Sequence, residues 1–177
     1  MKNKENFLYQ EVLIPNLDKI YAEIQTYDRL LNYKGKFSLC DVAQSEKSLP
    51  TLWSWFQQQK LCVHLVCHIH LFSGVSQPIH TDANDPILAL NFPISGCETT
   101  PTVFYKNKGT FIKYFTPKTN LPYFQYTDSN PEEIGRYTLT KPTLINIKTP
   151  HAVLNSSNFD RVCFSFRFKP DPWNLVT

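Results

Sequence analysis

Apolar residues that recur at helical spacing predict two helices near the amino end of the chain. The first has Asn16 or Asp18 as its cap, and its apolar face consists of Leu17, Ile20, Tyr21, Ile24, Tyr27 and Leu31. The second can be capped by Ser48, has Pro50 in its first turn and carries an apolar stripe of Leu52, Trp53 and Phe56. Both faces are most simply packing surfaces for a sheet.

From Leu61 onward, short apolar or alternating runs replace the helical pattern. Turn-forming segments such as Ser73-Gly74 and Asn84-Asp85-Pro86 separate these runs. Roughly eight short strands at this spacing predict a β-sandwich, jelly roll or barrel. The two helices would then cover the outer face of one sheet. The runs lie at 61–72, 87–94, 102–106, 111–115, 121–126, 136–140, 143–148 and 161–169.

The last run alternates strictly between two kinds of side chain. Period two places polar or small residues on one face and apolar residues on the other. Two interpretations fit this pattern: an outer sheet with arginines in water, or a barrel whose polar interior is closed by a second layer over the apolar face. The polar face is Arg161, Cys163, Ser165 and Arg167, and the apolar face is Val162, Phe164, Phe166 and Phe168.

Composition narrows the class of protein. The 177 residues suit one domain, with a helical support over 1–60 and a β core over 61–169, and a hydrophobic fraction of 42% excludes disorder as the main state. A net charge of +3 without a Lys/Arg run makes nucleic acid an improbable partner. No apolar run approaches the roughly 20 residues of a membrane helix. A polar start without an apolar leader and five cysteines without disulfide spacing predict a cytoplasmic protein with reduced thiols.

Three residues have the spacing of a metal site. His80 and Asp82 point to the same side if they lie on a strand, and His151 follows 71 residues after His80, directly after an apolar strand. Two imidazoles and one carboxylate can hold a metal on one face and leave three coordination positions open. Fe(II) is the usual occupant of such a set.

An arginine completes this pattern. If 155–158 forms a hairpin turn centred on Ser156, then His151 lies directly opposite Arg161 on one face of the sheet, although a one-residue change in loop length would reverse the faces. A guanidinium binds a carboxylate through two parallel hydrogen bonds. A metal at one end of a small dianion and an arginine at the other describe a 2-oxoglutarate site.

These residues resemble the motif of the Fe(II)- and 2-oxoglutarate-dependent dioxygenases, which have a double-stranded β-helix, or cupin-like jelly roll. The resemblance covers about residues 61–169. The residues around the motif are similar to those of small bacterial and phage members of the family. It implies iron ligands at His80, Asp82 and His151, a salt bridge from Arg161 to 2-oxoglutarate and a hydrogen bond from Ser165. The implied activity is hydroxylation of a substrate, with release of succinate and CO2, because halogenating relatives lack the carboxylate that Asp82 provides.

Other residues are candidates for the cosubstrate pocket. Asn91 and Tyr105 each lie near a strand end, and His70 shares a strand face with His64 and His68. We expect these histidines to line the cavity, since a single strand spreads them too far apart to form a separate zinc site. Arg167 is a second clamp, a substrate contact or a charge at the barrel rim. The aromatic stretch 107–136 forms either two more strands with a long loop or a lid over the metal.

Two alternatives to an oxygenase remain at this stage. The same three ligands could belong to a cupin-like metal-binding protein without oxygenase activity, or the barrel could be a non-catalytic structural or interaction module. The expected partner of an oxygenase is a small molecule or a protein or peptide substrate.

Overall fold

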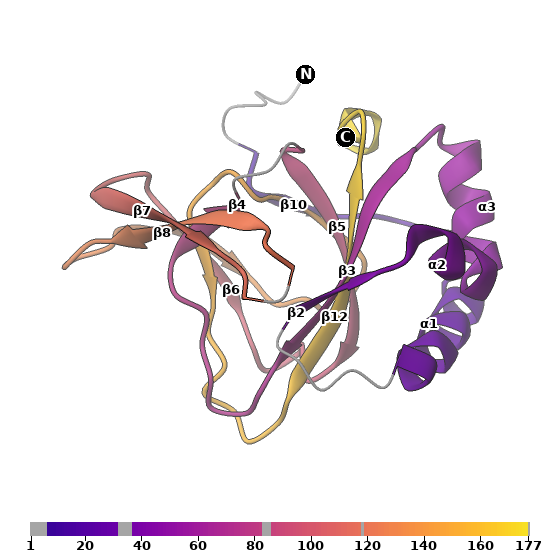
Figure 1. Ribbon diagram of the computed structural model, residues 1–177, viewed down its shortest axis with the longest axis horizontal. Coiled ribbons are helices and arrows are strands. Elements are labelled where there is room, and N and C mark those ends of the chain that lie inside the picture. Colours follow the sequence, from indigo (N-terminus) through magenta and orange to yellow (C-terminus); the bar gives the residue numbers. More distant parts are fainter. Residues whose placement is uncertain (1–6, 32–36, 83–85, 118, 177) are drawn as a thin grey trace.

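The computed structural model describes residues 7–31, 37–82, 86–117 and 119–176. Within this part of the chain, two six-stranded antiparallel sheets face each other, and helices cover the outer side of one sheet (Figure 1). The mainly β jelly roll predicted from the turn-separated runs is therefore confirmed.

Successive central strands alternate between the two sheets. The first sheet, in spatial order, contains β1 (Tyr9–Glu11), β10 (Thr143–Asn146), β5 (Leu88–Ser95), β12 (Arg161–Phe168), β3 (Val63–Leu71) and β2 (Phe37–Cys40). The second contains β7 (Thr110–Phe115), β8 (Pro122–Thr127), β4 (His80–Asp82), β11 (His151–Val153), β6 (Thr102–Tyr105) and β9 (Glu133–Tyr137). The chain thus passes back and forth between the sheets from β3 to β6, and each crossing adds one strand to the opposite sheet.

Three helices, rather than the two predicted, lie ahead of β3 in the described residues: α1 (Leu17–Leu31), α2 (Val42–Ser48) and α3 (Pro50–Gln58). The predicted capping role of Ser48 is wrong, because this residue ends α2. The first turn of α3 is instead bound by α1. The Glu23 carboxylate accepts hydrogen bonds from the Thr51 amide at 3.0 Å and from the Thr51 hydroxyl at 2.5 Å. A short 3-10 helix, Trp173–Leu175, follows β12.

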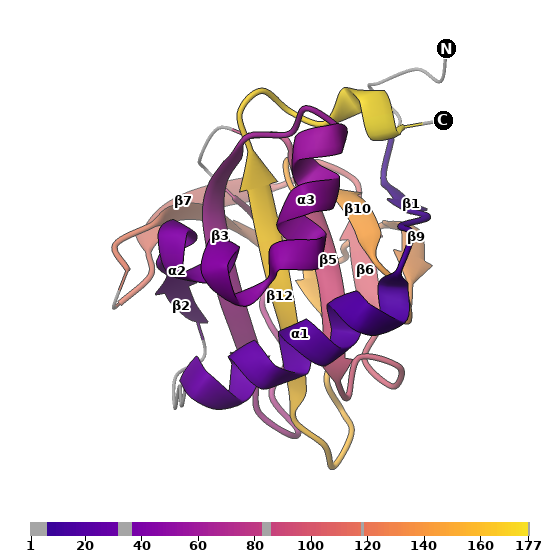
Figure 2. The ribbon, with the colours of Figure 1, turned by 90° about the vertical axis from the view of Figure 1, so that its right-hand side faces the viewer.

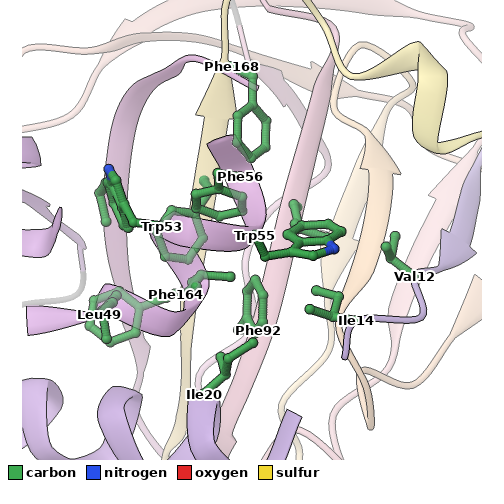
Figure 3. Packing of buried hydrophobic residues seen from close by; sticks show 14 of the residues in the cluster. Val12, Ile14, Ile20, Leu49, Trp53, Trp55, Phe56, Phe92, Phe164 and Phe168 are labelled. Atoms are coloured by element: carbon green, nitrogen blue, oxygen red, sulfur yellow. The ribbon is translucent and has the colours of Figure 1, made fainter. Parts of the chain in front are cut away.

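The helices and the apolar face of β12 form the main core. Figure 2 shows α1 and α3 lying across β3, β12 and β5. Phe164, Phe166 and Phe168 all point into this layer, where Phe166 meets Trp53 edge to face at 5.8 Å and Phe168 meets Phe56 at 5.2 Å (Figure 3). The opposite face of β12 is therefore turned into the barrel. Of the two interpretations of the alternating strand, the barrel is confirmed, because four residues of β12 face its interior and not bulk water: Arg161, Cys163, Ser165 and Arg167. The interior as a whole is not polar, because most of the other lining residues are apolar.

The predicted hairpin between the last two strands is wrong. His151 on β11 pairs with His80 on β4, whereas Arg161 on β12 pairs with Leu71 on β3 in the other sheet. The connection is a crossover, and Asn155 fixes its path. The buried Asn155 amide group donates hydrogen bonds to the carbonyls of Phe72 and Phe159, each at 3.0 Å. These bonds hold the chain across the barrel end instead of folding it back on itself.

All five cysteines are free, and four of them are buried. Among the described helices, none combines the length and the apolar character that a membrane crossing requires.

The core predicts a large difference between two phenylalanines near the end of the chain. Phe166→Ala removes a fully buried ring and should lower the free energy of unfolding by about 3–5 kcal/mol. Phe159 is 66% exposed, so Phe159→Ala should change it by less than about 0.5 kcal/mol. Urea denaturation of both variants measures the difference. Equal losses would contradict the packing of β12 against the helices.

Candidate active site

A cavity of about 450 Å³ lies between the two sheets. Its walls are mostly apolar, with residues such as Leu65, Ile69, Leu71, Ile145, Ile147 and Val153. The charged or titratable groups among its lining residues include those predicted for the site: His80, Asp82, His151, Arg161 and Arg167. The fold thus brings together in one cavity residues from β4, β11 and β12, which are far apart along the chain.

The two histidines are placed by strand register. His80 and His151 are direct partners on the antiparallel strands β4 and β11, and their ring centres lie 4.5 Å apart. In each ring, Nδ1 lies 2.9 Å from a backbone carbonyl, that of Pro78 or Thr149. A carbonyl only accepts hydrogen bonds, so Nδ1 carries the proton and Nε2 keeps its lone pair. This is the arrangement that metal-binding imidazoles adopt.

Asp82 lies on the same side of β4 as His80. One carboxylate oxygen is 4.0 Å from the His80 Nε2, and the other accepts a hydrogen bond from the Arg167 guanidinium at 2.9 Å. Burial opposes ionisation of Asp82. The charge of the Arg167 guanidinium, which also hydrogen-bonds the carboxylate, is the largest opposing effect, and the pKa of Asp82 lies below its ordinary value. Asp82 is therefore an anionic oxygen donor at neutral pH.

His151 is a neutral donor at the same pH. Burial, followed by the neighbouring His80, lowers the pKa of His151 to about 4. A neutral imidazole is the form that binds a metal.

The described residues nevertheless contain no group of three ligands already converged on one point. Two ligands about 2.1 Å from an octahedral ion, at right angles, lie about 3 Å apart, whereas Asp82 and His80 are separated by 4.0 Å. The donor chemistry of His80, Asp82 and His151 fits a divalent metal. The His80 and Asp82 donor atoms would have to approach each other by about 1 Å to bind one ion.

A hydrogen-bonded chain leads from Asp82 across the cavity. Arg167 donates to the Asp82 carboxylate and to the Ser165 hydroxyl, and that hydroxyl donates to the side-chain oxygen of Asn91. Arg167 is therefore a buried residue that holds Asp82, not a charge at the barrel rim. Ser165 and Asn91 both line the cavity, as predicted, although their hydrogen bonds are to each other and to Arg167.

Arg161 differs from Arg167 because it has no acidic partner among the residues that the structure describes. The side chain is 3% exposed, and its guanidinium contacts only the Cys163 sulfur, at 3.4 Å, among hydrogen-bond partners in the described residues. Its Nε has no partner in that part of the chain. A buried charge without a counter-ion is costly, by several kcal/mol. The group is thus available for an anion that enters the cavity.

Two predicted pocket residues lie elsewhere. His70 and Tyr105 do not line the cavity. On β3, the odd-numbered residues, Leu65 to Leu71, face inward, so the histidines at even positions face outward. His68 binds Asp28 of α1 at 2.7 Å, and His70 binds Asp160 at 2.8 Å. The expectation that these histidines line the cavity is wrong, because both sides of β3 are covered and alternation alone does not say which side is which.

The aromatic stretch 107–136 contributes to three strands rather than the two expected, and its role as a lid stays a prediction. It forms β7, β8 and β9, and the turn between β7 and β8 places Thr116, Pro117 and Leu121 on the cavity. Tyr123, at the start of β8, meets the His80 ring edge to face at 6.1 Å. Sequence reasoning did not single out Tyr123 for the site. Its only signal was the density of aromatic residues in this stretch.

Comparison with known proteins gives fold similarity without sequence similarity. No protein-family model and no curated protein matches the sequence. The epimerase SnoN, crystallised with Fe3+, alpha-ketoglutarate (2-oxoglutarate) and nogalamycin RO, matches with a TM-score of 0.57 at 15% identity, over 92% of this chain and 78% of SnoN.

Two further solved structures have the same fold. The non-heme alpha-ketoglutarate-dependent carbocyclase SnoK matches with a TM-score of 0.52 at 10% identity, over 93% of this chain and 80% of SnoK. A prolyl-4-hydroxylase from Pseudomonas putida matches with a TM-score of 0.50 at 11% identity, over 93% of both chains. This chain therefore shares its cupin-like jelly-roll fold with these three proteins.

Burial of neutral His151 predicts a pH dependence of stability in the metal-free protein. An ordinary histidine has a pKa near 6.5, so between pH 6.5 and 4 the unfolded chain binds a proton that the folded chain does not. The free energy of unfolding should therefore decrease as the pH falls through this range, by up to about 3 kcal/mol from this residue. Urea denaturation with a chelator present, at pH 7, 5.5 and 4.5, should give a shallower decrease for His151→Gln than for the wild type. Parallel curves would contradict the shifted pKa.

Proposed function

We propose that this chain is a non-haem, Fe(II)- and 2-oxoglutarate-dependent dioxygenase that hydroxylates its substrate and releases succinate and CO2. In this proposal His80, Asp82 and His151 hold the iron, and Arg161 binds 2-oxoglutarate. The proposal rests above all on Arg161: a buried guanidinium without an acidic partner in the described residues faces the same cavity as a two-histidine, one-carboxylate set. A dicarboxylate that binds a metal at one end supplies the missing counter-ion at the other.

The bound iron would supply oxygen activation, and the chain's own residues would prepare the site for it. The hydrogen bonds from Nδ1 of His80 and His151 to backbone carbonyls orient both Nε2 atoms into the cavity. Arg167 keeps Asp82 ionised and fixes one of its oxygens, so that the other remains free to bind. The apolar walls exclude water from the reacting atoms.

Asp82 also favours hydroxylation over halogen transfer, because a carboxylate occupies the position that a halide would need. We further propose a cytoplasmic enzyme that acts on a substrate other than nucleic acid.

The first test of this function is a titration of the metal-free protein with Fe(II) and 2-oxoglutarate under anaerobic conditions. We expect a visible charge-transfer band when both are present and, on admission of oxygen, succinate formation that requires Fe(II). Asp82→Ala should abolish both signals, because two imidazoles alone leave the set incomplete. A protein that binds metal with no response to 2-oxoglutarate would instead be a cupin-like metal-binding protein, and the proposal would fail.

Arg161 has a test that does not depend on turnover. In Arg161→Met, 2-oxoglutarate should bind at least about 10-fold more weakly, since a charge-assisted hydrogen bond contributes about 1.5–3 kcal/mol. The cosubstrate-free variant should be as stable as the wild type or more stable, because a buried unpaired charge is removed. The matched control is Arg136→Met, which removes an exposed arginine paired with Glu133 and should leave 2-oxoglutarate binding unchanged. Thermal unfolding with and without 2-oxoglutarate reads both effects, and an equal ligand-induced shift in all three proteins would rule out Arg161 as the clamp.

A further inference from the structure

The strands β7 and β8 extend the second sheet beyond the barrel. β8 pairs with β4, which carries His80 and Asp82, and β7 pairs with β8 and forms the edge of the sheet in the described structure. Figure 1 shows both strands on the far side of the molecule from the helices. All six residues of β7 are exposed, although four of them are large apolar residues: Phe111, Ile112, Tyr114 and Phe115.

Strand register shows which side chains continue the inner face of the cavity. Tyr123 is the direct partner of Asp82 and also of Tyr114, and Gln125 is the partner of both His80 and Ile112. Directly opposed residues on antiparallel strands share a face. Tyr114 and Ile112 therefore lie on the same side of the sheet as the metal-ligand candidates.

The aromatic rings on this face form a continuous path. Tyr123 lines the cavity and meets His80 at 6.1 Å, and Tyr114 stacks on Tyr123 with ring centres 5.7 Å apart and planes inclined by 24°. Tyr114 is 40% exposed and Ile112 is 50% exposed. We name Ile112, Tyr114 and Tyr123 the aromatic shelf. These three residues lead from the cavity to solvent, and none of them is charged.

The outer face of the same hairpin has a different character. Phe111, Lys113 and Phe115 lie there by alternation, and the Lys113 ammonium is 5.3 Å from the centre of the Phe115 ring. Phe111 packs against Phe124 and Tyr126. This face carries a charge and is turned away from the cavity side of the sheet, so it provides an internal control for the shelf.

We propose that the aromatic shelf is the binding platform for the substrate, and that the substrate is an uncharged molecule with a planar ring system. Stacking of a flat ring on Tyr114 and Tyr123 would direct one edge of the molecule into the cavity, toward His80 and Asp82. We expect the substrate to be uncharged because the charged side chains that line the cavity are already engaged, either by each other or by the proposed iron and 2-oxoglutarate. The catalytic meaning of the shelf thus rests on the proposed function, but the binding of a ring does not.

The test uses the full metal-free chain and two neutral probes: 2-naphthol, which is planar, and decahydro-2-naphthol, which is not. A third probe, naphthalene-2-sulfonate, is planar and charged. It is compared with 2-naphthol in the Arg161→Met variant, because the unpaired Arg161 guanidinium of the wild type would otherwise bind it. Dissociation constants come from chemical-shift titrations of the labelled protein. We expect 2-naphthol to bind more tightly than the other probe in each comparison. Tyr114→Ala and Ile112→Ser should each weaken its binding, Tyr114→Ala by about fivefold. Phe111→Ala, on the outer face, should change it by less than twofold.

Three outcomes would overturn the proposal: an equal affinity of wild type and Tyr114→Ala for 2-naphthol, an equal loss in Phe111→Ala, or a preference for the non-planar probe or, in Arg161→Met, for the sulfonate. Self-association through β7 would also overturn it, and sedimentation of wild type and Ile112→Ser detects that case. Because the titration contains neither iron nor 2-oxoglutarate, its result is independent of the succinate assay. Ring binding without succinate formation would leave the shelf as a binding site and remove only the proposed function.

Discussion

A charged side chain inside an apolar barrel must have a counter-ion or bear a large desolvation cost, and this constraint organises the cavity. Arg167 meets the requirement within the chain, through Asp82 and the Ser165–Asn91 hydrogen bond. Arg161 is six residues away on the same strand, and in the described part of the chain its one hydrogen-bond partner is the Cys163 thiol. One arginine therefore holds a residue of the site, and the other is available to bind a ligand.

This division depends on β12 being buried on both faces. The phenylalanines on one face need an apolar layer, and α1 and α3 supply it by packing across the first sheet. The arginines on the other face can then be enclosed only by the second sheet, which carries His80 and His151. The helices contribute no residue to the cavity lining. They support the site by fixing which side of β12 faces inward.

Strand register in the second sheet places both the candidate metal ligands and the aromatic shelf on one face. Cross-strand partners share a face, so the row that contains Asp82 also contains Tyr123 and Tyr114. The same register that positions the candidate ligands inside the barrel continues outward onto exposed aromatic rings. Chemistry and substrate recognition, as proposed here, would then occupy the inner and outer parts of a single sheet surface, with the turn at 116–121 at the boundary.

The sequence by itself determined the class of fold and the four central side chains of the site. Turn-separated runs indicated a jelly roll, and period two on 161–168 separated the arginines from the phenylalanines. The spacing of His80, Asp82, His151 and Arg161 singled out four side chains that line one cavity. These features are local, or depend on side-chain type, and so they can be read from the chain alone.

Only the tertiary structure decided how those residues meet. Alternation on β3 could not show that His68 and His70 face outward, since both sides of that strand are covered. The hairpin assumed between β11 and β12 proved to be a crossover between sheets, because buried Asn155 binds the backbone of distant segments. The ion pair of Arg167 with Asp82 joins residues 85 positions apart. Strand pairing and the packing of layers are long-range choices, and no local pattern encodes them.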